Sequence, residues 1–143
     1  MAKLENKLKL KRIKIGVLGG TFDPAHRGHL EISKQAKKRF GLKNIIWAIT
    51  KQNPFKGEGK SNLRSRMQLA KKIIGKNNYI KIKFYEERIG SNRTIDLVKH
   101  LTKKKINEIY FIMGADNLIN FHKWYKWKSI IKKCNLLVLI LSQ

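Results

Sequence analysis

Short apolar runs that alternate with helical patterns constrain the fold of this chain more than any other feature. Five runs have the length and the Ile-rich character of strands buried on both faces of a sheet. They are Ile13–Leu18, Asn44–Ile49, Tyr79–Ile82, Glu108–Met113 and Asn135–Leu141. Helical patterns lie between them, at His29–Phe40, Leu63–Ile74, Thr94–Lys104 and Trp124–Lys132. The alternation predicts an α/β fold, a mostly parallel sheet with right-handed crossovers and helices on both faces.

The length of 143 residues fits one domain. Residues 1–12 are basic and are expected to be a frayed N-terminal segment, so the folded domain is expected to span residues 13–143. The last predicted strand runs almost to Gln143, and an α/β domain seldom ends on a core strand, so we expect the domain to be incomplete at its C-terminus. The single Cys134 cannot form an internal disulfide, and no apolar run reaches the roughly 18 residues of a membrane span. These features predict a cytoplasmic protein without membrane segments.

Charge is the most unusual bulk property, with 33 Lys and Arg residues against 9 Asp and Glu residues. A net charge of +24 attracts polyanions, so a nucleic-acid partner is one interpretation. The lysines, however, are scattered along every segment and form no basic–aromatic alternation of the kind found in RNA-binding sheets. We therefore attribute the positive charge to compositional drift together with a small anionic substrate, in preference to a nucleic-acid partner. The sequence leaves the oligomeric state open, a homo-oligomer included.

A glycine- and histidine-containing segment follows the first predicted strand and opens the first helix. It reads Gly-Gly-Thr-Phe-Asp-Pro-Ala-His-Arg-Gly-His from Gly19 to His29. Ligands of open parallel sheets bind at the carboxyl ends of strands, and paired glycines let the backbone approach a phosphate. His26 and His29 are three residues apart at a helix start, where backbone N–H groups and the helix dipole favour anions. The segment predicts a triphosphate site.

The two histidines have two other interpretations. They could ligate zinc, but no Cys, Asp or Glu stands nearby in a metal-site spacing to complete the set. They could also be incidental residues in a glycine turn. The combination of both glycines with both histidines favours phosphate binding.

This segment resembles the signature of the nucleotidyltransferases that carry a His/Thr-x-Gly-His motif, which have a Rossmann-like fold. These enzymes join a nucleoside triphosphate to a phosphorylated acceptor, with Mg²⁺, and release pyrophosphate. They include adenylyltransferases of NAD and coenzyme A synthesis and several cytidylyltransferases.

Three later segments carry further candidate residues, each with a structural alternative. Asp116 follows the strand that ends near Gly114 and could accept hydrogen bonds from ribose hydroxyls or cap a helix. Trp124, in Phe-His-Lys-Trp-Tyr, could stack on an aromatic ring or anchor the core. Thr94 lies at a helix start, where capping is the simple explanation. The polar loop 51–62 is either a substrate loop or plain surface.

Together these segments resemble the bacterial nicotinate-nucleotide adenylyltransferases, over about residues 13–141. The resemblance implies that His26 and His29 are catalytic and hold the ATP phosphates. It implies further ATP-binding residues at Gly19, Gly20, Thr21, Phe22, Gly28, Gly114 and Asp116. It implies nicotinate mononucleotide contacts at Lys56, Thr94, Trp124 and Tyr125. Phe55 departs from the commoner His of a Pro-His-Lys loop.

The implied reaction is attack of the nicotinate mononucleotide phosphate on the α-phosphorus of ATP, which yields deamido-NAD and pyrophosphate. Mg²⁺ would be held mainly by the substrate phosphates, with no protein metal site. The family also carries a Ser-x-Thr-x-x-Arg segment after the last strand, which this sequence lacks. The alternatives are a pantetheine-phosphate adenylyltransferase, a cytidylyltransferase, or an inactive remnant that binds nucleotide or nucleic acid.

Overall fold

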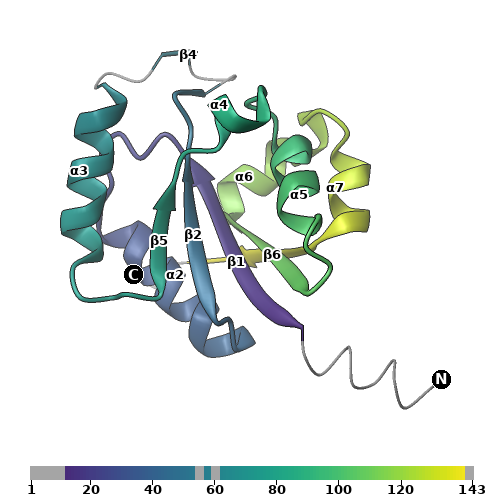
Figure 1. The fold of residues 1–143 in the computed structure, drawn as a ribbon, viewed down its shortest axis with the longest axis horizontal. Helices are drawn as coiled ribbons and strands as arrows, with labels where there is room; N and C mark the ends of the chain where they lie inside the picture. Colours follow the sequence, from purple (N-terminus) through teal and green to yellow (C-terminus); the bar gives the residue numbers. More distant parts are fainter. Residues whose placement is uncertain (1–11, 54–56, 59–61, 141–143) are drawn as a thin grey trace.

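A five-stranded parallel sheet forms the centre of the protein (Figure 1). The structure is a computed structural model that describes residues 12–53, 57–58 and 62–140. The strands are β1 (Ile13–Gly20), β2 (Asn44–Ile49), β5 (Ile80–Lys83), β6 (Asn107–Gly114) and β7 (Asn135–Leu139). Their order is β5-β2-β1-β6-β7 and every neighbouring pair is parallel, as the alternation of strands and helices predicted. Residues 1–11 of the segment that was expected to be frayed lie outside the described residues, and only its last residue, Arg12, is described.

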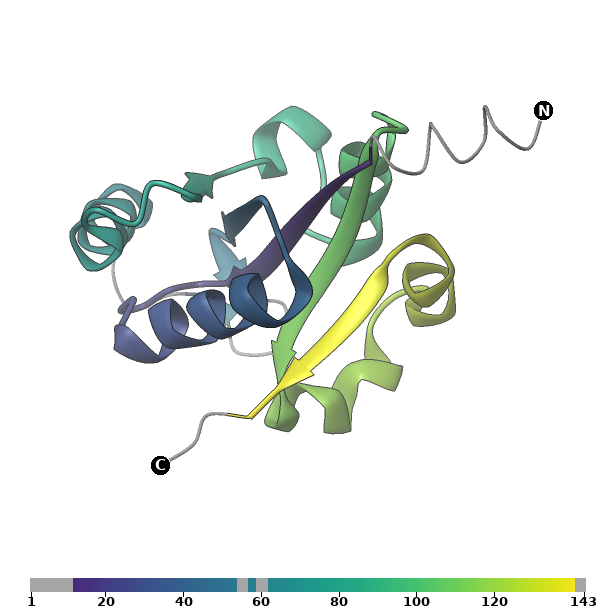
Figure 2. The same ribbon diagram turned by 90° about the horizontal axis from the view of Figure 1, so that it is seen from below.

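Helices cover both faces of the sheet (Figures 1 and 2). One side carries α2 (Arg27–Phe40) and α3 (Leu63–Ile74), and the other carries α5 (Thr94–Thr102) and α7 (Trp127–Lys133). Five shorter elements complete the described part of the fold: α4 (Glu86–Ile89), α6 (Ala115–Asn120), the 3-10 helix Phe121–Lys123, and the antiparallel strands β3 (Gln52–Asn53) and β4 (Gly57–Glu58). Within the described ranges, no helix is both long and apolar enough to cross a membrane.

Alternate residues of the central strands supply two separate cores. In β1, Leu18 packs in the cluster that includes Ala36 of α2 and Ala70 of α3. Its neighbour Val17 packs in the second cluster, which includes Val98 of α5 and Ile130 of α7. This alternation follows from the two-residue period of a strand and explains why both faces of β1 and β2 are apolar.

Helix boundaries differ from the sequence prediction in two places that matter for the site. The first helix begins at Arg27 instead of His29, because the side chain of His26 caps it. The last helix begins at Trp127 instead of Trp124, because Lys126 has a left-handed backbone (φ 52°) that separates it from the preceding 3-10 helix. Trp124 and Tyr125 therefore lie in a connecting turn and not on a helix.

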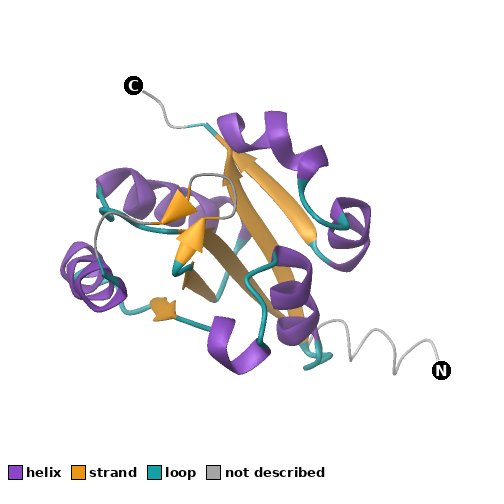
Figure 3. Ribbon diagram, turned by 90° about the horizontal axis from the view of Figure 1, so that it is seen from above, coloured by secondary structure: helices purple, strands orange, loops and turns teal. Residues whose placement is uncertain are grey.

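The strand order reverses between β1 and β6. From β1 the chain proceeds outward through β2 to β5, and it then returns to β6 on the other side of β1. Leu18 pairs with Ile112, so the last residues of these strands, Gly20 and Gly114, reach the same edge of the sheet. Figure 3 looks onto this edge. Ligands of open α/β sheets bind at such a switch point, outside the carboxyl ends of the strands.

Candidate active site

Two histidines cap the helix that starts beside the switch point. Nδ1 of His26 accepts a hydrogen bond from the backbone N–H of Gly28 at 3.0 Å. Nδ1 of His29 accepts one from the backbone N–H of His26 at 3.1 Å. The pair forms a capping box in which imidazoles take the place of the usual hydroxyl and carboxylate. The two rings are tilted against each other by 30°, with centroids 3.9 Å apart.

The capping bonds determine which nitrogen of each ring carries a proton. A ring nitrogen that accepts a hydrogen bond is unprotonated, so each neutral imidazole here carries its proton on Nε2. Burial and the nearby His26 lower the pKa of His29 from 6.5 to about 4, so His29 is neutral at pH 7. The site therefore presents two Nε2–H donors at the positive end of the α2 dipole.

Buried aromatic side chains pack near the ring of His29 and hold it in place. Phe22 is only 2% exposed and its ring lies 4.7 Å from that of His29 and 5.0 Å from that of Trp47, on which it stacks. Nε1 of Trp47 donates to Oγ of Ser33 at 2.8 Å, and this hydroxyl donates to the carbonyl of His29 at 2.8 Å. Phe22 was predicted to contact ATP; in the structure it is a packing support for His29 with almost no exposed surface.

The other predicted residues of the phosphate segment line the same turn. Gly19 and Gly20 end β1, Thr21 follows, and Gly28 lies in the first turn of α2. A Cβ on Gly19 or Gly20 would meet no atom closer than 3.6 Å, so packing within the protein does not require glycine at either position.

Gly114 and Asp116 lie across the switch point from this segment. Gly114 is the N-cap of α6 and Asp116 is in its first turn, where a carboxylate interacts favourably with the helix dipole. A Cβ on Gly114 would lie 2.7 Å from Oδ1 of Asp116, so the carboxylate folds over the glycine. The alternative of a helix cap is wrong for Asp116, because the cap position belongs to Gly114.

Two of the predicted mononucleotide residues, Thr94 and Tyr125, lie beside Arg93 at the start of α5. Thr94 is the first residue of α5, and the N-cap is Arg93, so the capping alternative for Thr94 is also wrong. The guanidinium of Arg93 lies over the ring of Tyr125, 4.0 Å from its centroid. Trp124 packs edge to face against Phe121 and Phe111, which makes it a partly buried flank of the second core. Sequence reasoning missed Arg93.

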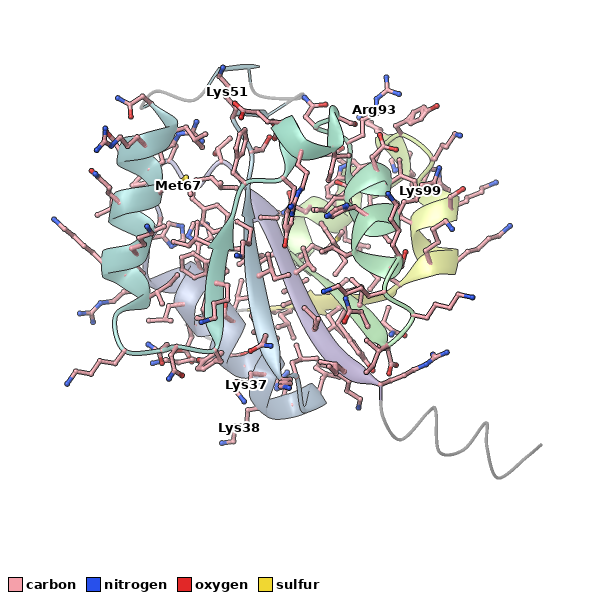
Figure 4. The ribbon with its side chains drawn as sticks, in the orientation of Figure 1. Lys37, Lys38, Lys51, Met67, Arg93 and Lys99 are labelled. Atoms are coloured by element: carbon pink, nitrogen blue, oxygen red, sulfur yellow. The ribbon has the colours of Figure 1, made fainter. Side chains whose placement is uncertain are left out.

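Charged side chains are dispersed over the surface. Figure 4 shows Lys51 and Arg93 at the edge where the strands end, whereas Lys37, Lys38 and Lys99 lie elsewhere on the molecule. Lys56, the predicted phosphate contact of the acceptor, falls outside the described residues. In the part of the chain that the structure describes, no three His, Cys, Asp or Glu side chains come together as metal ligands.

A buried arginine that the sequence analysis did not select lies beside the phosphate segment. Arg66 of α3 is 3% exposed and lines a small hollow together with Asp23 and Pro24. Its guanidinium donates to the carbonyls of Thr21, Thr50 and Lys51. The signal was available, because Arg66 precedes the buried Ala70 and Ile74 at intervals of four residues and so shares their face of the helix.

Comparisons with known proteins agree with this geometry. Residues 17–142 match the model of the cytidylyltransferase-like family. A protein of Pelagibacter ubique named "Probable nicotinate-nucleotide adenylyltransferase" is 75% identical over 138 residues, which cover 96% of this chain and 77% of that relative. A Roseobacter denitrificans protein of the same name is 40% identical over 126 residues. Those residues cover 87% of this chain but only 63% of the relative, so the chain spans less than two thirds of that protein.

A solved structure has the same fold. The nicotinic acid mononucleotide adenylyltransferase of Plasmodium falciparum, complexed with NaAD, superposes with a TM-score of 0.75 at 18% identity. The match covers 92% of this chain and 77% of that one. The family match and the curated relatives show that this chain belongs to the cytidylyltransferase-like nucleotidyltransferases and, within them, to the nicotinate-nucleotide adenylyltransferase family.

Proposed function

We propose that the protein transfers the adenylyl group of ATP to nicotinate mononucleotide and releases deamido-NAD and pyrophosphate. The observation that carries the proposal is the pair His26 and His29, whose Nδ1 atoms are both engaged by backbone N–H groups at the start of α2. The relatives named as nicotinate-nucleotide adenylyltransferases support the choice of substrates.

Two Nε2–H donors at a helix N-terminus suit a reaction in which negative charge moves onto phosphate oxygens. Donors that are fixed before the substrate arrives stabilise this charge without reorganising, which is how most phosphoryl and nucleotidyl transfer is accelerated. The capping bonds and the packing of Phe22 fix the rings in this way. His29 stays neutral at pH 7 and therefore acts as a hydrogen-bond donor instead of a fixed cation.

The chemistry needs no protein nucleophile or general base. A phosphate oxygen of the mononucleotide, already anionic, attacks the α-phosphorus of ATP and forms the new P–O–P bond. The bond between the α-phosphorus and the bridging oxygen breaks, and pyrophosphate leaves with the electron pair. ATP enters as its Mg²⁺ complex, and we propose that the phosphates bind the ion. The site contributes alignment and charge stabilisation.

We assign the predicted site residues to two groups, one for each substrate. On the ATP side, we assign Gly19, Gly20, Thr21 and Gly28 to the phosphates and Gly114 with Asp116 to the adenosine. On the acceptor side, we assign Lys56, Thr94, Trp124 and Tyr125 to nicotinate mononucleotide. Trp124 would stack on the pyridine ring, while its T-shaped contacts with Phe111 and Phe121 hold the indole in place.

An acceptor survey tests the proposal. Purified protein is incubated with MgATP and, separately, nicotinate mononucleotide, nicotinamide mononucleotide or phosphopantetheine, and pyrophosphate is measured. A parallel arm replaces ATP with CTP. We expect release with ATP and nicotinate mononucleotide, with deamido-NAD identified by mass. Release only with phosphopantetheine or only with CTP would assign the protein to another branch of the family. Calorimetric binding of a short RNA in preference to both substrates would support the nucleic-acid alternative.

A further inference from the structure

The buried guanidinium of Arg66 joins the phosphate segment to the start of the loop that follows β2. Nη1 donates to the carbonyl of Thr21 at 2.8 Å and to that of Thr50 at 2.7 Å, and Nη2 donates to the carbonyl of Lys51 at 3.0 Å. Thr21 follows β1, whereas Thr50 and Lys51 follow β2. A single side chain of α3 thus holds the two loops that leave the central strands.

These bonds fix peptide orientations as well as distances. In a trans peptide the N–H points away from the carbonyl of the same plane. The Thr50 carbonyl points to Arg66, and the N–H of the same peptide, on Lys51, points to Oε1 of Glu86 at 3.3 Å. The hydroxyl of Thr50 donates to the same carboxylate oxygen. Arg66 and Glu86 therefore hold the segment Thr50–Lys51 from opposite sides.

The peptide between Thr21 and Phe22 in the phosphate segment is oriented in the same way. Because Arg66 holds the Thr21 carbonyl, the N–H of the same peptide, on Phe22, points away from the guanidinium. Phe22 has a left-handed backbone (φ 51°) that a bulky residue seldom adopts, and its ring supports His29. A change in the orientation of the Thr21 carbonyl would therefore move the ring of Phe22 and, with it, the ring of His29.

We propose that Arg66 is a positioning residue that fixes where the ATP phosphates and the acceptor phosphate lie relative to each other. The proposal rests on the proposed function, in which His26 and His29 hold ATP and the loop that begins at Lys51 contacts the mononucleotide. Arg66 touches neither substrate: it acts through the carbonyls of Thr21, Thr50 and Lys51. In-line attack depends on the relative placement of the two phosphates, and a misplacement of about 1 Å costs on the order of 100-fold in rate.

The test compares Arg66→Lys with Lys72→Met, a change at an exposed position of the same helix. Lysine keeps the charge and most of the length, but its ammonium lacks the planar fork that reaches three carbonyls. We expect Arg66→Lys to stay folded while its kcat falls about 10- to 100-fold and its KM for the mononucleotide rises. A variant with wild-type kcat and KM would overturn the proposal. So would a loss of activity that equals the loss of folded protein.

Chemical rescue provides a second readout. Arg66→Ala enlarges the hollow beside Asp23 and Pro24, through which added guanidinium can enter. We expect guanidinium, at concentrations below those that denature the protein, to restore part of kcat in Arg66→Ala and none in Arg66→Lys. Equal responses in the two variants would contradict the positioning role.

Hydrogen exchange separates this inference from the proposed function. Arg66→Lys should speed amide exchange at Thr50 and Lys51 and weaken ATP binding, with little change at β6 and β7. This outcome supports the role of Arg66 even if the wild-type protein transfers no adenylyl group, a result that would refute the proposed function alone. Exchange that is unchanged, or raised uniformly across the sheet, would overturn the role of Arg66.

Discussion

The backbone N–H of His26 donates to Nδ1 of His29 at 3.1 Å, so the first residue of the motif fixes the ring of the second. Burial, and after it the nearby ring of His26, lowers the pKa of His29. The capping bonds thus start α2 and select the tautomer of each ring, while burial keeps His29 neutral. The requirements of the helix start and of the chemistry coincide in these two side chains.

Acid should destabilise the protein through His29. Its pKa is about 4 when folded, against an ordinary value of 6.5, so the unfolded chain binds the proton more readily. The free energy of unfolding should therefore fall as the pH drops from about 6.5 towards 4, and this contribution is fully present above 6.5. Denaturant titrations across this range measure the slope, and His29→Asn should flatten it. An unchanged slope in that variant would assign the acid sensitivity to other groups.

The hydroxyl of Ser33 should be important for stability even though it is small. Ser33→Ala leaves the buried indole N–H of Trp47 without its acceptor and removes the bond to the His29 carbonyl. A loss of about 1–3 kcal/mol in the free energy of unfolding is expected. Ser65→Ala, at an exposed position of α3, is the control and should change little. Adding Trp47→Phe to Ser33→Ala should cost less than the sum of the two single changes.

Two glycines of β1 should respond differently to alanine. A Cβ on Gly16 would lie 2.9 Å from Cδ1 of Leu42 and 3.0 Å from Cδ1 of Ile112, so Gly16→Ala should destabilise the fold by about 1–3 kcal/mol. A Cβ on Gly20 meets nothing closer than 3.7 Å. Gly20→Ala should therefore leave thermal unfolding nearly unchanged and raise KM for ATP. Equal stability losses would mean that Gly20 serves packing instead of the ligand.

The thiol of Cys134 should be inert. Burial raises its pKa to about 11, and its Sγ lies 3.3 Å from the carbonyl of Ile130. Little thiolate exists at pH 7, so iodoacetamide should label the native protein slowly and the unfolded protein rapidly. Rapid labelling of the native protein would show that the last turn of α7 opens easily.

The long elements were predictable because each carries a complete pattern. Asn44–Ile49 and Leu63–Ile74 have the predicted bounds, and the switch point follows from the strand order. The short helices α4 and α6 were missed because four to six residues are too few to show a periodicity.

The site was predictable only where its residues are close in sequence. Gly19 to His29 form one continuous segment, so their chemistry could be inferred directly. Arg93 over Tyr125 and Arg66 against Thr21 are separated by 30 residues or more, and nothing local links the partners. Such contacts depend on how α3 and α5 pack against the sheet. Single-sequence patterns do not specify this.

The most direct test of the central claim is the rate of pyrophosphate release from ATP and nicotinate mononucleotide by His29→Ala. His100→Ala, which removes a histidine of α5 that packs against Tyr85, is the matched control. We predict that His29→Ala stays folded and loses on the order of 10²–10³ in kcat, while His100→Ala retains nearly full activity. Near-normal turnover by folded His29→Ala would contradict the account.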